Sequence, residues 1–333
     1  MDTAFIILCV VVFLALAFDF INGFHDTANA IATSVSTRAL SPRVAILLAS
    51  TMNFIGALTF TGVAKTIGGS VANPAQLEHG VQIVIAALLA AIIWNLATWW
   101  FGIPSSSSHA LIGALAGSVI GAAGISGING SGFTSIIQAL IFSPLIAFTL
   151  GFILMWVLKK VFANRSPHQI NKGFRTSQIF TAAFQAFTHG TNDAQKAMGI
   201  ITFALVAAGI QDNLDVPLWV KLSAATAMAL GTSVGGWKII KTMGTKIFKI
   251  EPINGFAADA ASAAVILTAT ITHFPVSTTH TITSSILGVG SAKRFSAVKW
   301  SVAGRILIAW VITIPISLVL GAVLFKLIEW IWL

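Results

Sequence analysis

Long apolar stretches recur along this chain and restrict its fold more than any other feature. They cover about residues 3–21, 44–64, 81–101, 134–158, 218–234, 255–274 and 300–325. A helix needs about 20 mainly apolar residues to cross the hydrocarbon core of a bilayer. Only 9% of the 333 residues are charged, whereas soluble domains carry roughly a quarter. The sequence therefore predicts an all-α integral membrane protein and excludes soluble globular, disordered and coiled-coil folds.

Shorter apolar segments follow motifs that contain glycine, proline and polar residues. They lie at about 27–37, 110–125, 179–188, 197–210 and 281–290. Because none can span a bilayer alone, we expect broken helices and re-entrant helical hairpins, which membranes tolerate where the backbone lines a protein cavity. Spans and segments together predict about 10–12 membrane helices or half-helices. With one cysteine, Cys9, a disulfide framework or a cysteine metal cluster is excluded, and we expect no resident metal or cofactor.

The basic residues predict the orientation of the chain. Fifteen of the 19 lysines and arginines lie in four connections, at 38–43, 159–178, 237–251 and 293–305. Alternating spans with the N-terminus outside put all four on the cytoplasmic side, in accord with the positive-inside rule. We therefore expect both termini outside and the basic loop 159–178 in the cytoplasm. The net charge of +9 then reflects membrane topology, and we expect no nucleic-acid partner.

A series of motifs occurs twice, in the same order. Gly23 to Ala30 (GFHDTANA) recurs loosely as Gly190 to Ala197 (GTNDAQKA), Pro42 as Pro217, Lys65 to Gly68 as Lys241 to Gly244, and Pro104 to His109 (PSSSSH) as Pro275 to His280 (PVSTTH). Equivalent loops differ in charge: 38–43 carries two arginines and 209–217 two aspartates, while 65–80 carries one lysine and one glutamate and its counterpart four lysines. The two copies are therefore expected to face opposite sides of the membrane. We expect an N-terminal repeat at 1–158, a basic linker at 159–178 and an inverted C-terminal repeat at 179–333, forming one transport domain. Inverted repeats with interrupted helices are the architecture of secondary transporters.

The first motif places ionisable groups within apolar sequence. Asp26 and Asn29 fall one helical turn apart on one face, and Asp193 occupies the matching site of the second copy. Because charges inside a membrane are costly and mark functional sites, we interpret both aspartates as ion- or proton-coupling groups. The alternative is that each caps a half-helix.

Three neighbours of the aspartates complete the coupling set: His25, Asn192 and Lys196. Lys196 either forms a local ion pair with Asp193, or its ammonium takes the place of a bound cation and meets the anion. His25 is either a proton carrier, because its unperturbed pKa is about 6.5, or a donor to Asp26. The sequence leaves both choices open.

The second motif predicts an anion site. In each copy a proline precedes a cluster of hydroxyls that opens an apolar half-helix, and hydroxyls with free N–H groups at a helix N-terminus bind anions. The predicted substrate-binding residues are Ser105, Ser106, Ser107, Ser108, Ser277, Thr278 and Thr279. We interpret His109 and His280 as hydrogen-bond partners at the helix starts rather than metal ligands.

These motifs resemble the inorganic phosphate transporter (PiT) family of secondary carriers. GFHDTANA with HGTNDAQKA, and PSSSSH with PVSTTH, are most similar to its bacterial low-affinity Pit branch. The resemblance implies inverted repeats, re-entrant hairpins, a central phosphate site, a homodimer, and a bacterial cytoplasmic membrane as the location. It also implies that Asp26, Asn29 and Asp193 form the paired signature, and that a neutral metal–phosphate complex is a candidate substrate.

The chain departs from the sodium-coupled members of that family. His25 and Lys196 replace signature asparagines, and Lys65 and Lys241 stand where we would expect acidic residues. A fixed ammonium removes an oxygen ligand for sodium and supplies the charge permanently. We therefore predict proton coupling rather than sodium coupling for phosphate import.

Three other functions compete with this interpretation. A sulfate permease of the same family is the first, but phosphate keeps a proton near neutral pH that can be donated to Asp26 or Asp193, and sulfate has none. An intramembrane hydrolase would need a nucleophile–base pair or a metal site, and one half-site per repeat suits transport better. A channel is opposed by the intramembrane charges, which favour tight alternating binding.

Overall fold

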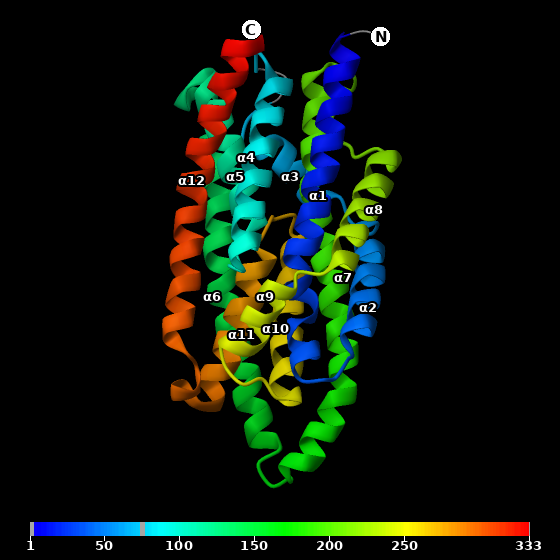
Figure 1. Cartoon of the computed structure of the whole chain (residues 1–333), viewed down its shortest axis with the longest axis vertical. Coiled ribbons are helices and arrows are strands. Elements are labelled where there is room, and N and C mark those ends of the chain that lie inside the picture. Colours follow the sequence, from blue (N-terminus) through cyan, green and yellow to red (C-terminus); the bar gives the residue numbers. More distant parts are fainter. Residues whose placement is uncertain (1–2, 74–76, 333) are drawn as a thin grey trace.

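The computed structural model of this chain describes residues 3–73 and 77–332 (Figure 1). Its α-helices are α1 (Thr3–Ser36), α2 (Pro42–Ala57), α3 (Gly62–Ser70), α4 (Gly80–Phe101), α5 (Ser107–Ala123), α6 (Gly130–Val161), α7 (Pro167–Ala207), α8 (Leu218–Val234), α9 (Trp237–Lys241), α10 (Pro252–Ile271), α11 (Thr278–Arg294) and α12 (Trp300–Trp332). Within those ranges there is no strand. Five helices are long and apolar enough to cross a membrane, or six if the bent pair α2–α3 is one span. The predicted all-α membrane fold is confirmed.

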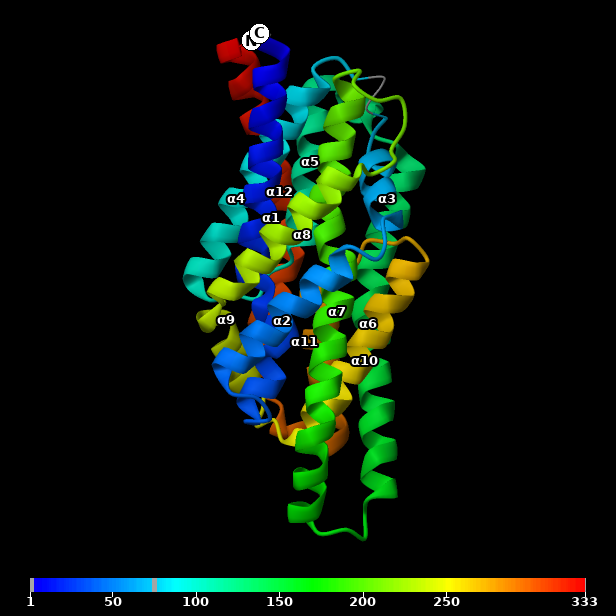
Figure 2. The same cartoon turned by 90° about the vertical axis from the view of Figure 1, so that its right-hand side faces the viewer.

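The helices of the first half recur in the same order in the second. A short 3₁₀ turn, Ile125–Gly127, follows α5, and another, Phe295–Ala297, follows α11. Packing exchanges partners between the halves: α5 packs on α12 and α11 on α6, while α1 packs on α8 and α7 on α2. Both termini lie at the upper end, and the α6–α7 connection lies at the lower end (Figures 1 and 2).

Helices α1 and α7 are continuous, so the predicted breaks at their motifs are wrong. The glycines there serve helix crossing: a Cβ on Gly23 would meet the backbone oxygen of Met228 in α8, and one on Gly190 would meet that of Asn53 in α2. Most of the predicted linker 159–178 is also helical, since α7 begins at Pro167 with Ser166 as its N-cap. The actual connection covers only 162–166.

Helices α2 and α3 meet at an angle of 70°, so the apolar stretch expected as a span at 44–64 is bent rather than straight. The helix ends at Ala57 and resumes at Gly62. At the restart, a Cβ on Gly62 would collide with the ring of His273, which follows α10. The bend is therefore fixed by packing against a distant segment.

Two helical hairpins, α4–α5 and α10–α11, enter from opposite ends, and their tips meet in the middle of the molecule (Figure 1). Ser106 caps α5 and Ser277 caps α11, each through a side-chain oxygen that accepts a backbone N–H three residues on. Within the hairpins, a Cβ on Gly117 or Gly288 would strike the backbone of α12 or α6, respectively. Close helix packing through glycine is typical of membrane proteins.

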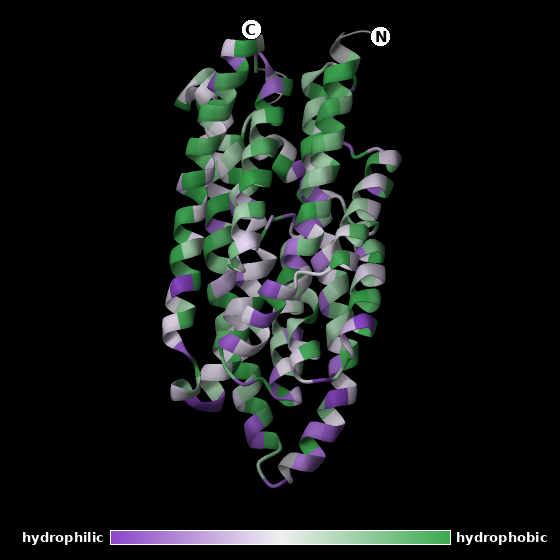
Figure 3. Ribbon diagram, viewed as in Figure 1, coloured by the Kyte–Doolittle hydropathy of each residue, from purple (hydrophilic) through white to green (hydrophobic). Residues whose placement is uncertain are grey.

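A polar layer separates two apolar clusters. On α1, the first cluster extends to Phe18 and the second begins at Ala28. The motif between them is hydrophilic and lies at mid-height, whereas hydrophobic residues cover most of the upper half and hydrophilic ones gather at the α6–α7 connection (Figure 3). The candidate site is therefore held between two packed apolar regions.

Candidate functional site

Asp26 lies at the centre of the polar layer, buried to 1% exposure. His25 Nδ1 is 2.7 Å from its Oδ1, to which Thr279 also donates (3.2 Å). Ser107 donates to Oδ2 (3.2 Å). Asp26 therefore contacts its own helix and the tips of both hairpins.

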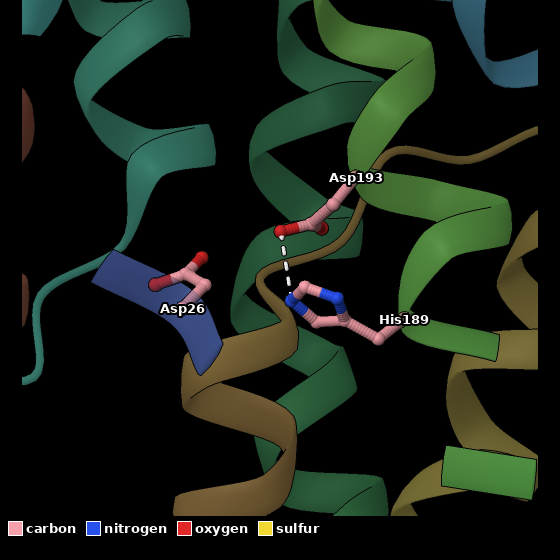
Figure 4. Close-up of side chains that lie close together, drawn as sticks. All are labelled: Asp26, His189 and Asp193. Atoms are coloured by element: carbon pink, nitrogen blue, oxygen red, sulfur yellow. Dashed lines mark ion pairs between the residues drawn. The ribbon is translucent and has the colours of Figure 1, made fainter. Parts of the chain in front are cut away.

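Asp193 has a similar environment on α7. Its Oδ1 lies 2.8 Å from Lys196 Nζ, and its Oδ2 accepts hydrogen bonds from Thr278 (3.1 Å) and Asn22 (3.4 Å). His189, one turn earlier, places Nε2 3.3 Å from the same oxygen (Figure 4). A compensating ammonium and several donors thus stabilise this buried carboxylate.

His189 is a site residue that sequence reasoning did not select. Asp26, His189 and Asp193 each offer a ligand atom, all within 4.8 Å of one another (Figure 4). Its Nδ1 lies 3.0 Å from Asn53 Oδ1, which fixes the ring. A signal was present: His189 stands 167 residues after Asn22, the same interval that separates Asp26 from Asp193.

The hairpin hydroxyls fall into two groups. Ser107, Thr278 and Thr279 point at the carboxylates. The remainder make structural contacts: Ser106 and Ser277 cap their helices, Ser108 donates to the backbone oxygen of Val276 (2.8 Å), and Ser105 donates to Thr98 (2.7 Å). All seven predicted hydroxyls are buried at the tips, but three of them converge on the centre.

Among the contacts between the two halves of the chain, those of Asn29 and Lys196 occupy equivalent places on the two motif helices. Asn29 of α1 donates to Thr279 (2.9 Å) and Thr278 (3.3 Å) of the second hairpin. At the equivalent place on α7, Lys196 donates to Ser107 of the first hairpin (3.0 Å). Each motif helix is therefore bonded to the hairpin of the opposite half.

His25 and Asn192 fix each motif helix to the hairpin of its own half. His25 Nε2 lies 3.2 Å from the hydroxyl of Thr98 on α4. Asn192 donates to Thr270 on α10 (3.2 Å) and accepts from the backbone of Val276 (3.3 Å). His25 also contacts Asp26, whereas the contacts of Asn192 lie with the second hairpin.

The first turns of α5 and α11 supply free donors. Backbone N–H groups in a first turn have no carbonyl partner within the helix, and the caps satisfy only those of His109 and His280. The amides of Ser107, Ser108, Thr278 and Thr279 remain, at the positive ends of two helix dipoles. The rings of His109 and His280 contact each other (centroids 4.3 Å apart) and hold the two tips together.

Polar contacts continue from the site toward the end opposite the termini. Gln185 donates to the backbone oxygen of Asn29 (3.2 Å) and accepts from Ser262 (2.8 Å). Further down, Asp259 accepts from Thr33 (2.7 Å). Asp259 is thus held by α1, and it does not touch the central carboxylates in any contact of the described residues.

A hollow lies beside each hairpin tip. One, of about 650 Å³, is lined by α2–α3 residues, including Lys65 and Thr66, and by His273 of the second tip. The other, of about 300 Å³, is lined by Pro104 of the first tip together with Lys246 and Arg305. Helix α3, which lines the first hollow, lies in the upper half of Figure 1, whereas the start of α12, which lines the second, lies in the lower half.

Comparisons with known proteins match the chain to one family. The sequence profile of the phosphate transporter family matches residues 22–171 and 161–321. A Bacillus subtilis protein named "Probable low-affinity inorganic phosphate transporter" is 60% identical over the full length of both chains. A Rhizobium meliloti protein of the same name is 45% identical over 96% of both. The solved structure titled "The sodium-dependent phosphate transporter" superposes with a TM-score of 0.86 at 24% identity, covering 98% of this chain and 99% of that one, which shows the shared fold.

Proposed function

The chain belongs to the phosphate transporter family, and we propose that it imports inorganic phosphate by proton symport, with alternating access around the site between the hairpin tips. The family and the relatives are transporters rather than enzymes, so the hydrolase alternative is set aside. The protein is a multi-pass membrane transporter. We propose the identity of the coupling ion, the roles of the site residues and the orientation of the chain in the membrane.

The observation that carries this proposal is the convergence of Ser107, Thr278 and Thr279 on two buried carboxylates and one ammonium. The first-turn amides offer donors to an anion from both hairpins, and each of these hydroxyls would turn its one O–H from a carboxylate to the anion when the anion binds. A phosphate that keeps a proton can also donate to Asp26 or Asp193. Sulfate lacks that proton and meets only repulsion from an ionised carboxylate, so phosphate fits this site better.

Proton coupling is supported by the contacts of Lys196. Its ammonium lies 2.8 Å from Asp193 and 3.0 Å from Ser107, where it supplies a permanent positive charge that a bound sodium ion would otherwise provide. Protonation of a buried carboxyl would offset the charge of the incoming anion and lower the cost of moving the loaded site through low dielectric. Sodium coupling is the alternative, because the structural neighbour is titled sodium-dependent.

The inverted arrangement of the two halves is also part of the proposal. It is supported by the recurring helix order, the exchanged packing partners and the hairpins that enter from opposite ends. In this proposal phosphate enters through one basic hollow and leaves through the other as the halves rock about the site. Both termini would lie outside a bacterial cytoplasmic membrane, and the transporter would work as a homodimer.

A divalent cation could travel as cargo with phosphate. Asp26, His189 and Asp193 supply carboxylate and imidazole donors within 4.8 Å of one another, a donor set suited to transition-metal ions. Lys196 competes for Asp193, so we expect any such cation to enter only with its phosphate. Uptake of radioactive manganese that depends on phosphate would support this part, and manganese uptake without phosphate would contradict it.

The decisive experiment is uptake of radiolabelled phosphate into proteoliposomes under a proton or a sodium gradient, with excess sulfate as competitor. We expect uptake that is driven by protons and resists sulfate. Uptake driven by sodium would reject proton coupling, and strong inhibition by sulfate would reject phosphate selectivity. Saturation with phosphate concentration would separate a carrier from a channel.

A further inference from the structure

Asp19 is a fully buried carboxyl group on α1, two turns before Asp26. Neither of its oxygens has a hydrogen-bond partner among the described residues. Asp26 has His25 at 2.7 Å and two hydroxyl donors, and Asp193 has Lys196 at 2.8 Å. Among these three buried carboxyls, Asp19 alone lacks a compensating partner, and an unpaired charge buried in this way is costly.

The groups that act on Asp19 belong to the coupling centre. They are Asn22 on the same helix and Asp193 and Lys196 on α7. The amide of Asn22 donates to Asp193 (3.4 Å), which links the two carboxyls. Asp19 and Asp193 therefore share one ammonium, which lies 2.8 Å from Asp193.

Helices α4 and α8, which pack on α1, offer Asp19 no compensating charge nearby. Helix α4, which packs on α1, has no ionisable residue between Gly80 and Phe101. Helix α8 contributes only Lys221, in its first turn, whereas α8 approaches Phe20 through Gly231, ten residues further on. Lys196 is the cation within electrostatic reach, and Asp193 already holds it.

We propose that Asp19 binds the coupling proton. The inference rests on the proposed proton symport and names the residue that carries its proton. A proton from the side of the termini adds to one carboxylate oxygen and forms a neutral acid, with no other bond made or broken. The new O–H can donate to Oδ1 of Asn22, which otherwise lacks a donor, so a single proton satisfies two unpartnered groups. When the site faces the cytoplasm, the same O–H bond breaks and the proton leaves.

The test compares net uptake with exchange. Exchange of internal for external phosphate moves no net proton, so it does not need a carrier that cycles between charged and neutral forms. We expect Asp19→Asn to keep exchange and to lose the stimulation of net uptake by an inward proton gradient. Asp19→Glu, which keeps a carboxyl, should retain the stimulation. Asp212→Asn, which removes an exposed acid near the termini end, is the matched control and should behave like the wild type.

Infrared spectroscopy provides a readout that does not depend on transport. The wild-type protein should show the carbonyl band of a protonated carboxyl that shifts when aspartate is isotopically labelled, and Asp19→Asn should lack that band. Full proton stimulation of uptake by Asp19→Asn, or an unchanged carbonyl band in that variant, would overturn the assignment. If Asp19→Asn also loses exchange, transport no longer distinguishes the outcomes, and the presence or absence of the band decides whether Asp19 holds the proton. If the wild type shows no proton stimulation, the proposed symport fails instead, whatever the variants do.

Discussion

The ammonium of Lys196 lies 2.8 Å from Oδ1 of Asp193, and both side chains are buried. Removing one member of a buried pair typically costs about 3–5 kcal/mol. The equivalent residue in the first half is Asn29, which is neutral. Among the described residues, the site therefore has one lysine ammonium, and it lies in the second half only.

Lys196→Asn tests what this cation does. We expect the variant to lose proton-driven uptake and to acquire a requirement for sodium, because an amide oxygen replaces the ammonium beside Asp193. Phosphate uptake measured with sodium or with choline in the medium would show this. Lys326→Asn, which changes an exposed lysine paired with Glu329, is the control. If Lys196→Asn takes up phosphate with the same ion dependence as the wild type, Lys196 serves only to pair with Asp193.

Asp26→Asn and Asp193→Asn should each abolish both net uptake and phosphate exchange. Each carboxylate accepts hydrogen bonds from hairpin hydroxyls, so its loss of charge disturbs the binding site as well as the coupling. This pattern differs from that expected for Asp19→Asn, which keeps exchange. Wild-type rates of uptake and exchange in both variants would refute the role of Asp26 and Asp193 in transport.

Ser107→Ala and Thr278→Val should weaken phosphate binding without removing coupling. Each removes one hydroxyl donor, worth about 1 kcal/mol, so the KM for phosphate should rise roughly fivefold. Ser135→Ala, in an exposed part of α6, provides the comparison. An unchanged KM in both hairpin variants would show that these hydroxyls serve only the fold.

Gly117→Val and Gly288→Val should destabilise the protein, because a Cβ at either site would strike the backbone of a neighbouring helix. Overpacking of this kind costs about 1–3 kcal/mol. Thermal unfolding in detergent would measure the loss against Gly304→Val, where a Cβ meets nothing within 4 Å. Equal melting temperatures in all three variants would contradict the close packing of the hairpins.

The proposed orientation can be tested with single cysteines. In a Cys9→Ser background, a membrane-impermeant maleimide added to intact cells should label Asp212→Cys and not Asn164→Cys. The first lies in the connection after α7, near the termini end, and the second in the α6–α7 connection (Figure 2). The reverse labelling pattern would place the termini in the cytoplasm.

The sequence predicted the helical membrane fold, because apolar length depends on local chemistry, and its motifs selected the candidate site residues. Apolar length dictates the spans, and the repeated Asp and hydroxyl motifs identified residues that the structure brings together. Continuity of α1 could not be predicted, since Asn22-Gly23 looks like a helix break in isolation. The structure shows that Gly23 serves the crossing with α8, a contact with residues about 200 positions away along the sequence.

His189 and the α2–α3 bend were missed for a related reason. His189 acts through Asp193 and Asn53, and the bend is fixed by the ring of His273. Both depend on contacts between segments far apart in the chain, which spacing and composition do not encode. Only the comparison of matching positions in the two halves could have drawn attention to His189.

The crossed contacts of Asn29 and Lys196 have a consequence for how the protein must be made. Each half carries hydroxyls that serve the other half's polar side chains, so a half synthesised alone would hold an incomplete site and unpaired polar groups in the bilayer. The five-residue connection at 162–166 therefore does more than join two helices. It guarantees that the ribosome delivers the two halves in a strict one-to-one ratio, side by side, as they enter the membrane.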